Sequence, residues 1–121
     1  MPGEFEVHKE ESQWRRDLSP LAYRVLRRRA TEPPFVNEHC RRRDAGVYRC
    51  AGCGEPLFDS DAKFDSGHGW PSFHSPTTEQ CIVTRSDREL GTERTEVLCA
   101  RCGGHLGHVF RDGPKPTGLR Y

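Results

Sequence analysis

The chain has 121 residues, 33% of them hydrophobic and 31% charged, so it is long enough for one domain with a core of ordinary size. Its 19 basic and 18 acidic residues give a formal net charge of +1, so no overall field attracts it to nucleic acid or to a membrane surface. No apolar run is long enough to cross a bilayer, and residues 1–30 lack the apolar centre of a signal peptide. We therefore expect a single domain over residues 1–121 that works as a cytoplasmic monomer, without nucleic acid or membrane as a partner.

Two short helices are expected near the amino terminus, after a polar and flexible end over residues 1–10. Ser12–Leu18 predicts the first helix, with Ser12 as its cap. Ser19–Pro20 predicts the start of a second helix that runs to about Arg29. The two helices carry several arginines: Arg15, Arg16, Arg24, Arg27, Arg28 and Arg29. On amphipathic helices such residues are typical of a solvated face, and a stripe that binds nucleic acid is the alternative.

After Gly46 the chain changes to short apolar runs separated by glycine, proline and aspartate, which predicts antiparallel strands. The expected strands are Val47–Cys50, Leu57–Phe58, Cys81–Thr84, Thr95–Cys99, Leu119–Tyr121 and one that starts at Val109–Phe110. A turn is expected at Ser86–Asp87. Lys63–Phe73 predicts a loop rich in glycine and aromatic residues, of the kind that often lines a site.

Two Cys-x-x-Cys pairs are the most specific motif in the sequence. The pairs are Cys50–Cys53 and Cys99–Cys102, and each is followed by a glycine, which permits the tight turn that lets both sulfurs face one ion. Four thiolates suffice for one tetrahedral zinc, so the sequence predicts a structural Zn²⁺ on Cys50, Cys53, Cys99 and Cys102. Residues 54–98 separate the pairs, more than the roughly 15 to 20 residues of small zinc modules. The ion would therefore close a whole subdomain.

Other interpretations of these cysteines remain open. Structural disulfides would need an oxidising compartment, which the absence of a signal peptide disfavours. A thioredoxin-like redox pair should lie beside a βαβ pattern, which the sequence does not show, and chance spacing is the third alternative. Cys40 and Cys81 remain after zinc has taken four cysteines, and each is either a buried small hydrophobic residue or a redox-active thiol.

Two histidines, His105 and His108, closely follow the second pair. Because a four-sulfur shell leaves zinc no open position, we interpret them as proton carriers or hydrogen-bonding groups rather than ligands. In the alternative, both are structural and donate to backbone carbonyls. Trp70 and Phe73 of the aromatic loop are expected to form an apolar wall opposite the histidines, with ordinary core packing as the alternative for Trp70.

Four stretches carry the motifs Cys50–Phe58, Lys63–Phe73, Cys99–Phe110 and Asp112–Tyr121. Together they resemble the methionine-R-sulfoxide reductase (MsrB) family, and the likeness covers the chain from about Ser12 to Tyr121. The resemblance implies a mainly β fold, with two antiparallel sheets forming a barrel-like domain, a zinc staple and short N-terminal helices. It also implies an oxidoreductase that reduces methionine-R-sulfoxide, free or in proteins, with thioredoxin or a similar thiol as the reductant.

The resemblance implies roles for individual residues. A nucleophile attacks the sulfoxide sulfur, and the departing oxygen needs a proton because a bare oxide is a poor leaving group. The family gives this proton transfer to His108, with His105 beside it. The substrate methyl packs on Trp70, with Phe73 in the same substrate-binding loop, and a wall that accepts a methyl but not an oxygen distinguishes the epimers. The product is a sulfenic acid or its selenium counterpart, which another thiol resolves.

Two positions depart from the family pattern. The family nucleophile, Cys or selenocysteine, directly follows the motif found here as Gly118–Tyr121, and none of the six cysteines has that position. We therefore expect the 121-residue polypeptide to be inactive, and hypothesise a selenoprotein whose in-frame UGA has been read as a stop, with a truncated chain or a fragment as alternatives. The second departure is His68, where many members place a resolving cysteine; Cys40 is then the candidate resolving thiol.

Two other functions remain open. A zinc-ribbon-like module would bind nucleic acid through its arginines, with a strong dependence on salt, although the near-neutral net charge argues against it. An inactive relative would retain affinity for oxidised methionine through Trp70 and His108, and would stay inactive after the missing residues were restored.

Overall fold

The structure, a computed structural model, describes residues 5, 7, 9–31, 45–64, 66–67, 69–88, 93–115 and 117–121. Its helices are α1 (Glu11–Asp17) and α2 (Pro20–Arg28), with single 3-10 turns at Ser60–Ala62 and Glu79–Cys81. Its strands are β1 (Val47–Arg49), β2 (Pro56–Asp59), β3 (Lys63–Phe64), β4 (Ser72–Phe73), β5 (Ile82–Asp87), β6 (Arg94–Cys99) and β7 (His105–Val109). The fold is mainly β with two N-terminal helices, as predicted. Neither described helix has the length and apolar character needed to span a membrane.

The two helices start differently. α2 begins as expected: the Ser19 hydroxyl accepts a hydrogen bond from Ala22 N at 3.2 Å. Such a cap contributes about 1 kcal/mol to stability. α1 begins at Glu11, so the prediction of Ser12 as its cap is wrong. The Glu11 carboxylate instead accepts a hydrogen bond from the Tyr23 hydroxyl at 2.6 Å, and this bond ties α1 to α2.

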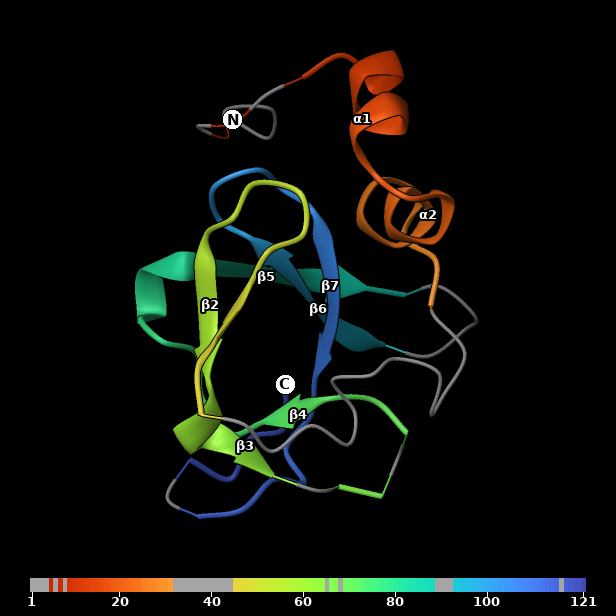
Figure 1. Cartoon of the computed structure of the whole chain (residues 1–121). Helices are drawn as coiled ribbons and strands as arrows, with labels where there is room; N and C mark the ends of the chain where they lie inside the picture. Colours follow the sequence, from red (N-terminus) through yellow and green to blue (C-terminus); the bar gives the residue numbers. More distant parts are fainter. Residues whose placement is uncertain are drawn as a thin grey trace.

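The strands form three antiparallel sheets. β1 pairs with β2, β3 pairs with β4, and β6 lies between β5 and β7 in the largest sheet. In Figure 1, α2 lies beside one end of β7, and β4 lies near the carboxyl end of the chain. The resemblance implied two sheets in a barrel-like domain. Because β3 and β4 have only two residues each and pair with each other, the described residues form three separate sheets, and no closed barrel is found among them.

Several strand boundaries differ from the prediction, and Leu119–Tyr121, predicted as a strand, forms only a single bridge between Arg120 and Phe110. Lys63–Phe73 was predicted as a loop, but its two ends pair with each other as β3 and β4. The turn predicted at Ser86–Asp87 is wrong, because β5 continues through both residues in register with β6. β7 begins at His105, earlier than the start predicted at Val109. Both histidines of the second motif therefore lie on a strand, where backbone pairing fixes their positions.

One core joins the helices to the strands. Its buried members are Trp14, Tyr23, Leu26, Cys50, Leu57, Phe58, Phe73, Cys81, Cys99 and Cys102. Phe73 stacks on Phe58 with ring centroids 4.5 Å apart and meets Tyr48 edge-on at 5.0 Å. Each such pair adds about 0.5–1.5 kcal/mol beyond simple burial. Cys81 is 3% exposed and its Sγ donates to Thr78 O at 3.1 Å, so of its two predicted states it has the buried one.

The prediction of a solvated arginine face holds for only part of the set. The exposed members are Arg15, Arg16, Arg24 and Arg28. Arg27 and Arg29 are half-buried instead. The Arg27 guanidinium lies 4.0 Å from the centroid of the Trp14 ring, and Arg29 Nε donates to Glu96 Oε2 at 3.1 Å. The helix pattern alone does not indicate this, because an arginine stem is apolar and the acceptor lies on a strand far away in the sequence.

Candidate active site and metal centre

The two Cys-x-x-Cys pairs bring four sulfurs together, as predicted. The Sγ atoms of Cys50 and Cys102 are 3.7 Å apart, those of Cys53 and Cys99 are 3.6 Å apart, and all four lie within 4.8 Å of one another. Two sulfurs that bind one tetrahedral zinc at about 2.3 Å would be about 3.8 Å apart, so these four residues fit Zn²⁺. The cysteines are free, and their sulfurs are much farther apart than the roughly 2.05 Å of a disulfide, which argues against the disulfide interpretation.

Matching turns present the sulfurs of the two pairs. The Gly54 N–H donates to Cys50 O at 2.8 Å, and the Gly103 N–H donates to Cys99 O at 2.8 Å. Gly54 has φ 81° and Gly103 has φ 76°, in the left-handed region that residues with a side chain rarely adopt. The glycine after each second cysteine is therefore required by the turn itself.

An arginine of α2 stands beside one of these sulfurs. Arg27 Nη2 donates to Cys102 O at 3.0 Å and to Cys102 Sγ at 3.2 Å. Hydrogen bonds from the thiols of Cys50 and Cys99 lower the pKa of Cys102, which favours the thiolate that metal binding requires. A cationic donor next to a shell of four thiolates offsets part of its negative charge.

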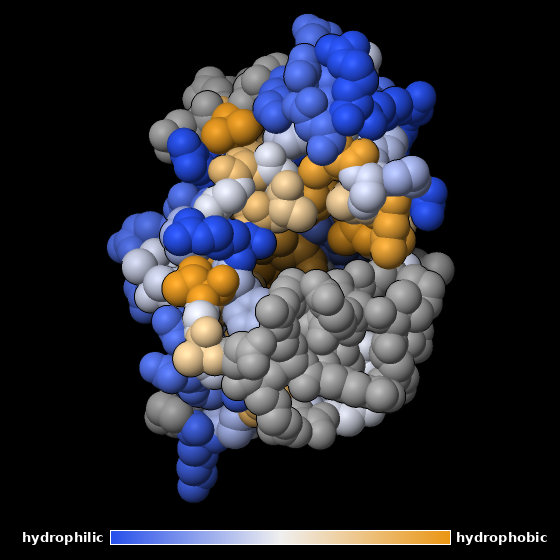
Figure 2. Space-filling view, in the orientation of Figure 1, coloured by the Kyte–Doolittle hydropathy of each residue, from blue (hydrophilic) through white to orange (hydrophobic). Residues whose placement is uncertain are grey.

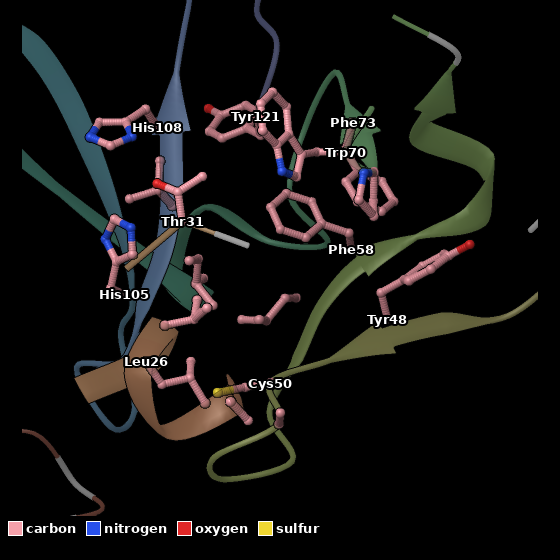
Figure 3. Close-up of a pocket in the computed structure, with 18 of the residues that line it drawn as sticks. Leu26, Thr31, Tyr48, Cys50, Phe58, Trp70, Phe73, His105, His108 and Tyr121 are labelled. Carbon is pink, nitrogen blue, oxygen red and sulfur yellow. The ribbon is translucent and has the colours of Figure 1, made fainter. Parts of the chain in front are cut away.

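A pocket of about 570 Å³ lies between α2 and the strands. Figure 2 shows apolar side chains around a hollow below the helices on this face of the molecule. The pocket is lined by His105, His108, Trp70 and Phe73, and also by Tyr121. In Figure 3 the two histidines lie on one side of it and the aromatic rings lie across from them. Its volume is typical of sites for small ligands.

His105 is held by a buried carboxylate. Its Nδ1 lies 2.6 Å from Oε2 of Glu96, which is 0% exposed, and Glu96 also accepts from Arg85 Nε at 2.8 Å and Arg29 Nε at 3.1 Å. Burial alone would raise the pKa of Glu96, but the bonds from Arg85 and His105 outweigh it and the pKa is lowered. Glu96 is therefore an ionised acceptor. Burial lowers the pKa of His105 against the opposing effect of Glu96, so at neutral pH His105 is neutral and donates from Nδ1.

His108 has a carboxylate partner of its own. Its Nε2 lies 2.7 Å from Oδ2 of Asp87, which is 4% exposed, and Arg29 Nη2 and Arg94 Nη2 lie 3.4 and 3.5 Å from the same oxygen. A carboxylate only accepts, so the hydrogen-bond network assigns the proton to Nε2 and leaves Nδ1 as the remaining polar atom of the ring. The rings of His105 and His108 are 5.6 Å apart, edge to face. Both partners are thus carboxylates, not the backbone carbonyls of the structural alternative.

Tyr121 is fixed beside the pocket by backbone pairing. Its N–H donates to Phe73 O at 2.8 Å, and Phe73 N donates to Tyr121 O at 3.2 Å. The preceding residue, Arg120, forms an antiparallel bridge with Phe110 and an ion pair of 2.8 Å with Asp112. Burial raises the pKa of the Tyr121 hydroxyl. The backbone that leads to the carboxyl end is therefore tied to the aromatic loop and to the extension of β7.

The sequence patterns do not indicate the groups that hold the histidines. They predict a turn at Asp87 and a solvated face for Arg29, and they give Glu96 no role. The available signal was a carboxylate, Glu96, directly before the apolar residues Val97 and Leu98 of a predicted strand, because a buried charge needs partners. The remaining predicted residues of interest, Cys40 and His68, lie outside the described residues.

Comparison with known proteins adds independent information. The SelR domain family matches residues 18–121. A peptide methionine sulfoxide reductase MsrB from Bradyrhizobium diazoefficiens is 62% identical over 115 residues, which cover 95% of this chain and 83% of the relative. Proteins of the same name from Thiobacillus denitrificans and Leptospira interrogans are 56% and 50% identical, over 93% and 97% of this chain and 86% and 89% of their own.

The fold, the four-cysteine cluster and the histidine pocket thus belong to a SelR-type domain. The extent of the match allows a more specific assignment. The chain belongs to the MsrB family of peptide methionine sulfoxide reductases, which are oxidoreductases, and the resemblance drawn from the four motifs is confirmed.

Proposed function

We propose that this protein reduces methionine-R-sulfoxide, free or within proteins, to methionine by nucleophilic attack on the sulfoxide sulfur. The pocket carries the proposal, because His105 and His108 line it together with Trp70 and Tyr121. The family resemblance places the nucleophile, cysteine or selenocysteine, directly after Tyr121. Since the Tyr121 backbone pairs with Phe73, a nucleophile at that position would start beside both the aromatic wall and the histidines.

In the first chemical step, the oxygen of the sulfoxide passes to the nucleophile. The substrate leaves as methionine and the nucleophile becomes a sulfenic or selenenic acid. His108 is proposed to protonate the sulfoxide oxygen as its bond to sulfur breaks. Its Nε2 is occupied by Asp87, so Nδ1 is the atom left for this transfer, and the Asp87 carboxylate balances the charge of the protonated ring.

Specificity for the R epimer is proposed to depend on the two sides of the pocket. Trp70 offers an apolar surface for the substrate methyl, while the histidines offer polar atoms to the oxygen. The epimer with the two groups exchanged would place an oxygen against Trp70 without a hydrogen-bond partner, which is costly. Phe73 supports this wall from behind, because it is 5% exposed and packs in the core.

Recycling requires a thiol and an external reductant. We propose that Cys40 attacks the sulfenic acid to give a disulfide and water, and that thioredoxin or a similar thiol then reduces the disulfide. In a chain that carries the nucleophile, Cys40→Ser should leave the first turnover intact and block recycling, because the sulfenic acid forms without the second thiol. Single-turnover and steady-state rates with thioredoxin measure this. Normal steady-state turnover in Cys40→Ser would exclude Cys40 as the resolving thiol, and Cys81→Ser is the matched control.

The remaining features follow the same proposal. The zinc is structural, because four cysteines fill a tetrahedral shell. Residues 1–121 are proposed to form one domain that is cytoplasmic and monomeric. If the nucleophile is selenocysteine, the protein is a selenoprotein, and codons beyond Tyr121 that include an in-frame TGA would support this.

The proposed function is tested with an extended chain, in which cysteine and the closing strand that the resemblance implies are added after Tyr121. This extended chain should reduce N-acetylmethionine-R-sulfoxide and leave the S epimer, with dithiothreitol as the reductant. Loss of the R epimer is measured by chiral chromatography. Binding without reduction would identify an inactive relative, and equal reduction of both epimers would refute the proposed specificity.

A further inference from the structure

We propose that Arg29 is a positioning residue that couples the two histidines of the pocket by bridging the carboxylates that hold them, Asp87 and Glu96. The inference rests on the proposed function, which gives the histidines their part in sulfoxide reduction. Arg29 itself does not line the pocket, whereas both histidines do. Its effect on the reaction would therefore be indirect.

The contacts of Arg29 reach both carboxylates at the atoms that bind histidine. Arg29 Nε donates to Glu96 Oε2 at 3.1 Å, the oxygen that lies 2.6 Å from His105 Nδ1. Arg29 Nη2 lies 3.4 Å from Asp87 Oδ2, the oxygen that lies 2.7 Å from His108 Nε2. One planar guanidinium thus links two carboxylate–histidine pairs, a geometry that a forked group allows and a point charge does not.

The backbone at Arg29 is a second, independent observation. Arg29 is the C-cap of α2 and has φ 59° and ψ 30°, the left-handed conformation. Among the described residues it is the only one other than glycine with a positive φ. Glycine is the residue favoured at such a helix end, so an arginine here carries a backbone cost that its side-chain contacts offset.

The charges around the histidines show why Arg29 differs from its neighbours. His105 faces Glu96 of β6, Arg29 and His108. His108 contacts Asp87 of β5 and the ring of His105. The other cations each pair with one of the two carboxylates, Arg85 with Glu96 and Arg94 with Asp87. Arg29 forms ion pairs with both carboxylates, with Asp87 at 3.4 Å and with Glu96 at 3.1 Å.

Removing the positive charge of Arg29 should strengthen the electrostatic attraction between each carboxylate and the protonated form of its histidine. Both imidazole rings should therefore stay protonated to higher pH. The experiment is a ¹⁵N NMR titration of the zinc-loaded 121-residue chain. In Arg29→Gln, the pKa values of His105 and His108 should both rise, by at least about half a unit. The exposed Arg24 of α2 supplies the matched control, and Arg24→Gln should move neither value.

Two further variants separate positioning from folding. Arg29→Gly suits the left-handed backbone, so it should keep the melting temperature while producing the same two shifts. Arg29→Lys keeps the positive charge but lacks the planar guanidinium that reaches both carboxylates. At most one histidine should then have the pKa that it has in the unsubstituted chain. The inference is overturned if Arg29→Gln moves only one histidine or neither, or if Arg29→Lys leaves both unchanged.

The titration does not depend on sulfoxide chemistry, so the two proposals fail separately. In the extended chain, Arg29→Gln should also move the limbs of the pH–rate profile to higher pH, in the direction of the histidine shifts. If the titrations shift while the unsubstituted extended chain reduces no sulfoxide, the link through Arg29 stands and the reductase proposal falls. If reduction proceeds with an unaltered pH profile in Arg29→Gln, the positioning role is refuted and the reductase proposal stands.

Discussion

Replacement of Cys99 by serine, or removal of the metal by a chelator, is expected to abolish cooperative unfolding of this protein. Cys99 is 0% exposed and ends β6, and Cys50 and Cys102 are buried in the same core cluster. The sulfurs come from two turns on either side of residues 54–98, so the ion would join two parts of the core that are distant in the sequence. In zinc-finger peptides a structural zinc contributes about 10–16 kcal/mol, as much as the whole stability of a typical domain.

Calorimetry and near-ultraviolet circular dichroism measure this effect, before and after chelation. Cys81→Ser is the matched control, because Cys81 is also a buried cysteine but lies outside the metal cluster. The hydroxyl of the introduced serine can still donate to Thr78 O, as the Cys81 thiol does. This variant should therefore keep one cooperative transition, at a somewhat lower melting temperature. A normal melting curve for the metal-free protein would contradict a structural role for zinc.

The parts of the fold that depend on local chemistry could be predicted from the sequence. Ser19 followed by proline fixed the start of α2, because capping involves only the first turn of the helix. The glycines after each cysteine pair indicated the two turns, since a positive φ is a property of one residue. The four-cysteine cluster followed from spacing alone, and the structure bears it out.

The short strands escaped prediction because they have no period of their own. β3 and β4 contain two residues each, fewer than alternation of polar and apolar side chains needs to be visible. The strand β7 includes Gly107, with φ 147°. Because glycine is unfavourable inside a strand, the sequence did not indicate that one strand runs from His105 to Val109. Pairing defines these strands instead: β3 pairs with β4, β7 pairs with β6, and the residues of one strand do not by themselves indicate its partner.

The polar network behind the pocket could not be predicted for a related reason. Its members come from three elements: Arg29 from the end of α2, Asp87 from β5 and Glu96 from β6. Charged residues such as these usually lie on the protein surface. Only the assembled fold buries the two carboxylates and gives them cationic partners. Histidine spacing identified the reactive pair, while its orientation depends on these long-range contacts.

In the extended chain, His108→Ala is expected to slow reduction of methionine-R-sulfoxide by about 100-fold or more, which corresponds to a barrier higher by about 2.7 kcal/mol. The sulfoxide oxygen would leave without its proton donor, while the apolar wall at Trp70 would remain. Asp87 would keep its ion pairs with Arg29 and Arg94, so the fold should be little changed. Single-turnover rates at saturating substrate measure the chemical step apart from recycling.

The control is His74→Ala, because His74 is half-buried, bonds its neighbour Ser75 at 3.3 Å and does not line the pocket. This variant should reduce the sulfoxide at close to the original rate. If His108 acts by proton transfer, small acids such as imidazolium added to His108→Ala should restore part of the rate, since the truncated side chain leaves space beside the substrate. An unchanged single-turnover rate in His108→Ala would assign the proton to another group, and His105, which also lines the pocket, would be the next to test.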